Sequence, residues 1–113
     1  MAKDKPMTAL CTYRVKPGGE KDFLKLLNAH WPTLHRLGLV SDEPRLVFRG
    51  HDSEKTTFFV EIFAWKDDRI FKKAHEYPEV MALWEPMEAM CEKRNGYPAC
   101  EFPHVEPLEL PRA

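Results

Sequence analysis

The sequence predicts an α+β domain in which a layer of helices covers one face of a small sheet. Four segments of strand-like composition and two of helical periodicity follow one another in the order β-α-β-β-α-β. The third strand is almost continuously apolar, which places it in the middle of the protein. Strands and helices in this order form a ferredoxin-like split β-α-β sandwich.

The chain has 113 residues, a formal net charge of -1 and 31% charged residues. This length predicts a single domain over residues 1–113, with short extended termini at 1–6 and 106–113. The near-neutral charge gives no reason to expect a nucleic acid or an anionic membrane as partner. No apolar run approaches the roughly 18 residues of a membrane span. The charged N-terminus does not begin a secretory signal, so we expect a cytoplasmic protein.

The first half of the chain supplies one strand and one helix. Residues 7–15 favour extended structure and end at the strong breaker at 16–19. A helix is predicted over residues 20–37, where apolar side chains recur at helical spacing. Pro32 falls inside this pattern and predicts a kink or a break near residues 30–31.

The second half begins with a hairpin. Residues 45–51 and 56–65 are predicted strands, joined by the polar turn 52–55. Asp67 is suited to cap a short helix that runs through His75.

A longer helix is predicted over residues 79–94, with a kink at Pro86. Its apolar stripe consists of Val80, Leu83, Trp84, Met87 and Cys91. The last predicted strand spans residues 99–105. Its Pro103 cannot donate a ladder hydrogen bond, so this strand is expected at an edge of the sheet.

The strand at 56–65 is apolar on both of its faces. One face carries Phe58, Val60, Ile62 and Ala64, and the other carries Phe59, Glu61, Phe63 and Trp65. A strand with one face in water would alternate with polar residues, and this one does not. We therefore expect a second copy of the same sheet to cover the second face, which gives a two-fold symmetric homodimer.

Residues 59–80, FVEIFAWKDDRIFKKAHEYPEV, carry a resemblance to a known family. They resemble the central strand, helix and His-containing segment of the antibiotic-biosynthesis-monooxygenase type of dimeric α+β barrel proteins. EIFAWKD resembles the third strand and its acidic cap, and AHEYP resembles the end of the short helix. The element order matches from about residue 7 to 105. The resemblance implies a homodimer whose two sheets face each other, with a small pocket in each subunit between sheet and helices.

The family includes cofactor-free oxygenases that act on polycyclic phenols and enzymes that degrade haem. The haem-degrading branch uses a His on the second long helix as iron ligand, and this chain has Trp84 near that place, so no haem is expected. The Asn and Trp placements of the oxygenase branch are not found, because Asn28 and Asn95 lie on or beside helices. The resemblance thus implies a protein without a bound cofactor.

The sequence offers no ligand set for a metal ion. Cys11, Cys91 and Cys100 are far apart and form no C-x-x-C pair, which is typical of reduced thiols rather than of a disulfide framework or a zinc site. His30 and His35 are five positions apart, not the four that place two ligands on one helix face. We therefore expect no bound metal.

Glu61 is the one carboxylate within the apolar strand, and several roles are open for it. In an aromatic cavity, desolvation would raise its pKa and make it a candidate proton acceptor or donor. Alternatively, it is paired with a cation such as Arg49 or Arg14 on a nearby strand, and is then held ionised and inert. Pairing across a dimer interface would instead make Glu61 a device for partner specificity.

His75 is the second candidate catalytic residue. It could shuttle protons near neutral pH, or its imidazolium could simply complement the negative end of the helix dipole. The sequence does not decide between these two roles.

A further group of side chains is predicted to hold a flat ligand. These candidate substrate-binding residues are Tyr13, His30, Trp31, Phe63, Trp65 and Trp84. His30 is expected at the pocket mouth, and Trp65, at a strand end, is expected in the lining. Large aromatic residues at core spacing are more often core, and this alternative is strongest for Trp84.

Two functions fit this sequence. The first is a small-molecule enzyme, a cofactor-independent monooxygenase (an oxidoreductase) acting on a planar aromatic substrate, in which Glu61 and His75 move protons. The alternative is a non-catalytic ligand-binding or stress-related homodimer. An RNA-recognition module shares the element order, but the chain lacks its glycine after the basic residue, its first-strand motif and any basic excess, so we reject it.

Overall fold

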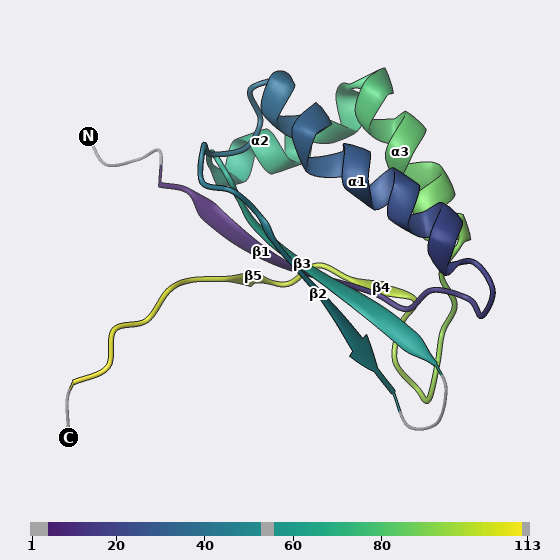
Figure 1. Ribbon diagram of the computed structural model, residues 1–113. Coiled ribbons are helices and arrows are strands. Elements are labelled where there is room, and N and C mark those ends of the chain that lie inside the picture. The colour runs from purple at the N-terminus through teal and green to yellow at the C-terminus, as the bar shows by residue number, and fades with distance from the viewer. Residues whose placement is uncertain (1–4, 53–55, 112–113) are drawn as a thin grey trace.

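A single sheet backs all the helices of the protein, as the computed structural model of residues 5–52 and 56–111 shows (Figure 1). The strands are β1 (Met7–Tyr13), β2 (Leu46–His51), β3 (Thr57–Trp65), β4 (Cys100–Glu101) and β5 (His104–Val105). The helices are α1 (Glu20–Arg36), α2 (Asp68–Lys73), the 3-10 turn η1 (Ala74–Glu76) and α3 (Pro78–Ala89). The helices lie on one face of the sheet and leave the other face bare (Figure 1). None of the helices in the described ranges is long and apolar enough to cross a membrane.

The sheet has the order β2-β3-β1-β4, with β5 also paired to β1, and every pairing is antiparallel. The predicted α+β, ferredoxin-like arrangement is therefore confirmed, including the hairpin of β2 and β3. The turn predicted between these strands includes residues 53–55, which lie outside the described residues. In the register, Glu61 of β3 stands between Cys11 of β1 and Val47 of β2, which places the carboxylate near the middle of the sheet.

Helix α1 runs from Glu20 to Arg36 without the break predicted at Pro32. A proline inside a helix removes the hydrogen bond to the carbonyl four residues earlier, here that of Asn28. That carbonyl accepts instead from the guanidinium of Arg45, at 3.2 Å. An outside donor thus replaces the missing helical one.

Helix α3 ends at Ala89, so the predicted extension to Arg94 is wrong. Beyond the helix the backbone pairs with the end of β1, because the amide of Lys16 donates to the Met90 carbonyl at 2.9 Å and Cys91 stands opposite Val15. Tertiary pairing outweighs the helical periodicity of this stretch.

The ends of two other elements follow their sequence signals. The Asp67 side chain caps α2 by accepting from the amides of Arg69 and Ile70, both at 2.9 Å. The last predicted strand lies at the edge of the sheet, but it is divided by Pro103 into β4 and β5. Pro103 cannot donate, and its carbonyl accepts from the Leu10 amide at 2.9 Å.

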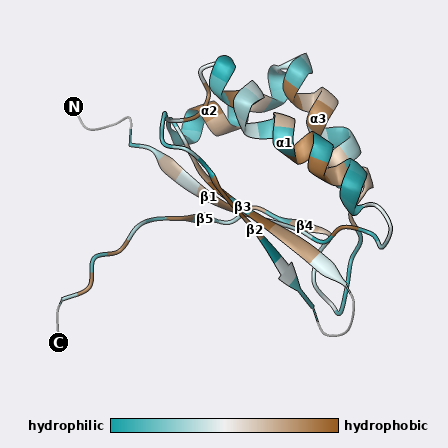
Figure 2. Ribbon diagram, viewed as in Figure 1, coloured by the Kyte–Doolittle hydropathy of each residue, from teal (hydrophilic) through white to brown (hydrophobic). Residues whose placement is uncertain are grey.

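The two faces of the sheet differ in how far this chain covers them. On the helix side, Phe59, Glu61 and Phe63 of β3 are buried, whereas their neighbours on the other side are only half-buried. Figure 2 shows β3 as an apolar ribbon along much of its length. We call the uncovered apolar surface the open face. It consists of Leu10, Leu46, Phe48, Phe58, Val60 and Ile62.

Candidate functional site

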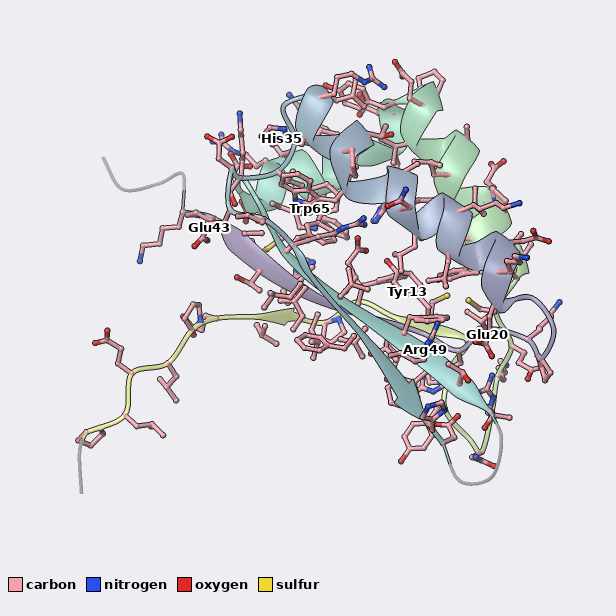
Figure 3. All side chains as sticks on the ribbon, viewed as in Figure 1. Tyr13, Glu20, His35, Glu43, Arg49 and Trp65 are labelled. Atoms are coloured by element: carbon pink, nitrogen blue, oxygen red, sulfur yellow. The ribbon has the colours of Figure 1, made fainter. Side chains whose placement is uncertain are left out.

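A cavity of about 270 Å³ lies between the sheet and the α2–α3 layer. Its lining comes from β1, β3, α1, the α2–α3 segment and the last two strands. The lining residues are Ala9, Cys11, Tyr13, His30, Phe63, Trp65, Phe71, His75, Met81, Trp84, Glu85, Met87, Glu88, Cys100, Phe102 and His104. Figure 3 shows the rings of Tyr13 and Trp65 between the sheet and the helices.

Aromatic rings form much of the cavity wall and pack edge to face. The rings of Trp65 and Trp84 have centroids 6.2 Å apart and planes 84° apart. Phe63 and Phe71 also meet Trp65 edge to face, at 5.2 and 5.6 Å. Such contacts fix the orientation of the rings, so the wall is largely preformed.

Glu61 lies behind this lining, with no exposed surface. The Tyr13 hydroxyl donates to Oε1 at 2.9 Å, and Arg45 donates to Oε2 at 2.8 Å. Nδ1 of His30 is also 2.9 Å from Oε1. Both carboxylate oxygens are therefore bonded, and two of the three partners, Tyr13 and His30, have a surface in the cavity.

These contacts keep Glu61 ionised. Burial alone would raise the pKa of the carboxyl group, but the interactions with His30, Arg45 and Tyr13 outweigh it and hold the pKa below its ordinary value of 4.5. Burial and the neighbouring Glu61 charge raise the pKa of Tyr13 well above 10.0. Tyr13 is thus a neutral hydrogen-bond donor to a charged acceptor.

Trp84 fixes the tautomer of His30. The indole Nε1–H can only donate, and it lies 2.8 Å from Nε2 of His30. Nε2 must then be the acceptor, which leaves the imidazole proton on Nδ1, where it donates to Glu61. Indole, imidazole and carboxylate form one directed chain of hydrogen bonds.

The cation that pairs with Glu61 is Arg45, not the expected Arg49 or Arg14. Arg49 stands opposite Phe59, and its guanidinium lies 5.5 Å from that ring. Arg14 bonds Glu101 at 2.7 Å. Arg45 reaches Glu61 from the segment before β2 and is anchored to α1 through the Leu27 carbonyl at 2.5 Å, as well as through the Asn28 carbonyl freed by Pro32.

The structure brings most of the predicted site residues together. Tyr13, His30, Phe63, Trp65, His75 and Trp84 line the same cavity. His30 is only 2% exposed and lies inside the site rather than at its mouth. Trp31 is not part of this lining, and its ring stacks on His35 at 4.7 Å.

His75 is an imidazole of the site that solvent reaches. It lies in η1, is exposed, and meets the Trp84 ring edge to face at 5.0 Å. His104, on β5, contacts the Phe71 ring in the same way at 4.7 Å. His104 is exposed on the predicted edge strand, and sequence reasoning did not connect it with the cavity.

The charged groups at the cavity are acidic. Glu85 and Glu88, both exposed on α3, belong to the lining, and among the described residues that line it there is no Lys or Arg. Within the same ranges, no group of three or more His, Cys, Asp or Glu side chains is suited to hold a metal ion. The cavity therefore offers aromatic surface, imidazoles and carboxylates to a ligand.

No family model and no curated protein matches this chain. Solved structures do match it. A mutant form of SnoaB, a cofactor-independent oxygenase from Streptomyces nogalater, superimposes with a TM-score of 0.69 at 13% identity, over 94% of this chain and 96% of that one. A candidate antibiotic biosynthesis monooxygenase from Bacteriodes thetaiotaomicron gives 0.62 at 16% identity, over 95% and 93%.

A third similar structure is a dimeric ferredoxin-like protein of unknown function from Jannaschia sp. CCS1. It gives a TM-score of 0.59 at 15% identity, over 89% of this chain and 98% of that one. At these identities the likeness establishes the fold. The resemblance to antibiotic-biosynthesis-monooxygenase-like proteins is thus confirmed at the level of the fold, over nearly the whole chain.

Proposed function

We propose that the protein is a homodimer that binds a small planar aromatic molecule and oxidises it as a cofactor-independent monooxygenase. The observation that carries this proposal is the aromatic cavity, with the exposed imidazole of His75 in its wall and an ordered hydrogen-bond chain behind it. The fold shared with SnoaB, described as a cofactor-independent oxygenase, supports the same reaction class.

In the proposed reaction, an electron-rich substrate reacts with dioxygen directly. His75 takes a proton from the substrate, whose carbanion or phenolate then supplies the electrons. One oxygen atom enters the product as a carbonyl, and the other leaves as water with the two hydrogens that the substrate loses, both from a CH2 carbon or one from a ring carbon and one from the phenol hydroxyl. The rings of Trp65 and Trp84 would hold the substrate in place, which lowers the entropic part of the barrier.

Glu61 serves this reaction through its neighbours. Its two oxygens are occupied by Tyr13, His30 and Arg45, so it holds the Tyr13 hydroxyl and the His30 ring in fixed orientations at the cavity wall. We assign it a positioning role and assign the proton transfer to His75.

The charge of the cavity favours a neutral ligand. Carboxylates and phosphates are usually bound by Arg, Lys or backbone amides. The described lining has Glu85 and Glu88 and no basic side chain beyond its imidazoles. We therefore expect polycyclic phenols to bind and their carboxylated or sulfonated analogues to bind at least tenfold more weakly.

A dimer is proposed because the open face has no cover within one chain. Leu46 and Phe48 are 56% and 51% exposed, and contiguous apolar surface of this kind marks an interaction site. The dimeric ferredoxin-like neighbour supports a second copy as the partner.

Oxygen uptake and binding, measured on matched variants, test the proposal. With a series of neutral polycyclic phenols, the wild type should consume oxygen and yield products that carry one added oxygen atom. His75→Gln should lower kcat by about a hundredfold and leave affinity, measured by tryptophan quenching, nearly unchanged. The control His51→Gln, at an exposed position outside the lining, should behave as the wild type. Absence of oxygen uptake with phenols that bind would reject the enzyme.

One observation favours a non-catalytic binding protein as the second candidate. The only carboxylate of β3 is fully paired, and a fully paired carboxylate is a poor proton acceptor. Glu61→Gln separates the two functions, since an enzyme that depends on Glu61 should lose turnover while it keeps ligand affinity. Tight binding without turnover in the wild type would favour the binding protein.

A further inference from the structure

Two thiols meet at the base of the loop that joins α3 to β4. Cys91 stands opposite Val15, and Cys100 stands opposite Tyr13. Tyr13 is the last residue of β1, Val15 follows two positions later, and both are buried. Because two positions along a strand span roughly 6.6 Å, their partners stand within the Cα separation that a disulfide needs, up to about 6.8 Å.

The loop between Cys91 and Cys100 also indicates that these two residues lie opposite each other. Arg94 and Tyr97 bridge across a tight turn whose central residues, Asn95–Gly96, have φ values of 52° and 83°. Positive φ at both positions is typical of a type I′ hairpin turn. Cys91 lies three residues before Arg94 and Cys100 three residues after Tyr97, so the two arms bring the thiols level with each other.

The two thiols differ in reactivity. The neighbouring Cys91 thiol lowers the pKa of Cys100 below its ordinary value of 9.0, whereas the contact with Cys100 and burial raise the pKa of Cys91. Cys100 is half-buried and lines the cavity, and Cys91 is 7% exposed. Burial and the charge of Glu61 raise the pKa of the third thiol, Cys11.

We propose that Cys91 and Cys100 are a reversible oxidation site, converted to an internal disulfide by low-molecular-weight disulfides such as glutathione disulfide. The Cys100 thiolate attacks one sulfur of glutathione disulfide, forms a mixed disulfide and releases one glutathione. Cys91 then gives its proton to solvent, attacks the Cys100 sulfur and releases the second glutathione. Two protein thiols are oxidised, and one glutathione disulfide is reduced to two molecules of glutathione. The proposed oxygenase activity is not a premise of this proposal.

Oxidation of the full-length reduced protein with glutathione disulfide tests the proposal. Intact mass should fall by two hydrogens, with no glutathione retained. Because Lys93 and Arg94 lie between the two cysteines, trypsin should release one disulfide-linked pair of peptides that contain Cys91 and Cys100. Dithiothreitol should restore the original mass.

Three variants make the assignment specific. Cys11→Ser should oxidise as the wild type does, and Cys91→Ser should stop at a stable glutathione adduct on Cys100. Cys100→Ser should lose at least nine-tenths of the reaction. A lasting glutathione adduct on the wild type, a disulfide that involves Cys11, or no reaction with the unmodified chain would each overturn the proposal. The wild-type peptide map decides the matter even where a variant fails to fold.

Discussion

On each of the two faces of β3, the polarity of the side chains is the opposite of what the burial of that face suggests. The face under the helices is fully covered, yet it contains a charged carboxylate, Glu61. The open face is apolar, yet two of its residues on β2, Phe48 and Leu46, are 51% and 56% exposed. The partners of the covered charge lie within the chain, whereas the exposed apolar surface has no cover among the residues that the structure describes.

This difference shows that partners, rather than polarity alone, decide where a side chain can lie. A buried charge is tolerated where hydrogen bonds replace the water that it loses. An exposed apolar surface persists where another molecule completes it. Each face can therefore be tested by removing the partner that accounts for it.

The largest effect is expected from Glu61→Ala. Removing the carboxylate leaves Tyr13 and His30 buried without their acceptor and takes the ion-pair partner from Arg45, which should lower the free energy of unfolding by about 3–5 kcal/mol. Urea unfolding followed by circular dichroism measures this. Glu101→Ala is the matched control, because Glu101 also pairs with an arginine on the sheet but is 37% exposed. It should cost less than about 1 kcal/mol, and equal losses for both variants would contradict the account.

The next effect concerns the open face. Phe48→Asp puts a charge where we expect the second copy to pack, and should raise the dissociation constant of the dimer by about a hundredfold, which corresponds to about 2.7 kcal/mol. Size exclusion with light scattering measures the change. Val47→Asp is the control. Val47 directly precedes Phe48 on β2 and is 42% exposed, but its side chain points to the helix side. A wild type that is monomeric at every concentration would remove the reason for the proposed interface.

A smaller effect is expected from pH. The pKa of Glu61 lies below 4.5 in the folded protein, so the unfolded chain binds this proton more readily. The resulting stability is fully present above the ordinary pKa and is lost as the pH falls through the folded pKa. Between about pH 6 and pH 3, the wild type should therefore lose stability more steeply than Glu61→Gln, which cannot titrate at this position. Parallel pH profiles in urea unfolding would show that Glu61 does not carry this dependence.

The smallest effect is expected from Trp84→Phe. The change removes one hydrogen bond to His30 and should cost about 1 kcal/mol. It also frees Nε2, so nitrogen NMR of His30 should show a mixture of tautomers in place of one. Trp31→Phe is the control, because the Trp31 indole N–H is buried without a hydrogen-bond partner in the described part of the chain. A His30 spectrum unchanged by Trp84→Phe would argue against the directed chain.

The fold was predictable because its signals are local. The spacing of apolar residues, the Asp67 cap and the missing amide hydrogen of Pro103 each act over a few positions. They predicted the helices, the start of α2 and the edge position of the last strand, although not its division into β4 and β5. The end of α3 was not predictable in this way. Residues 90–92 have helical periodicity but pair with β1, a contact that only the folded sheet provides.

The candidate site was predictable only in part. Pairing with a cation was one of the roles left open for Glu61, but the partner was not predictable. Val47 is the register neighbour of Glu61 on β2, and no periodicity indicates that Arg45 reaches across from the preceding segment. The role of His30 did have a sequence signal that was missed. His30 continues the buried stripe of α1, which consists of Phe23, Leu27, His30 and Leu34. A histidine in phase with the core residues of a helix indicates a buried partner.

The interruption at Pro103 also limits how copies of this chain can assemble. Addition of a further strand requires a run of free amides and carbonyls. The edge formed by β4 and β5 offers two strand residues on each side of Phe102 and Pro103, and Pro103 has no amide hydrogen. The six residues of β2 form the other, unbroken edge. Growth into a fibre needs two sheet edges on every molecule that can pair with another strand. Because only β2 offers such an edge, strand pairing between copies of this protein would stop after one β2-to-β2 contact.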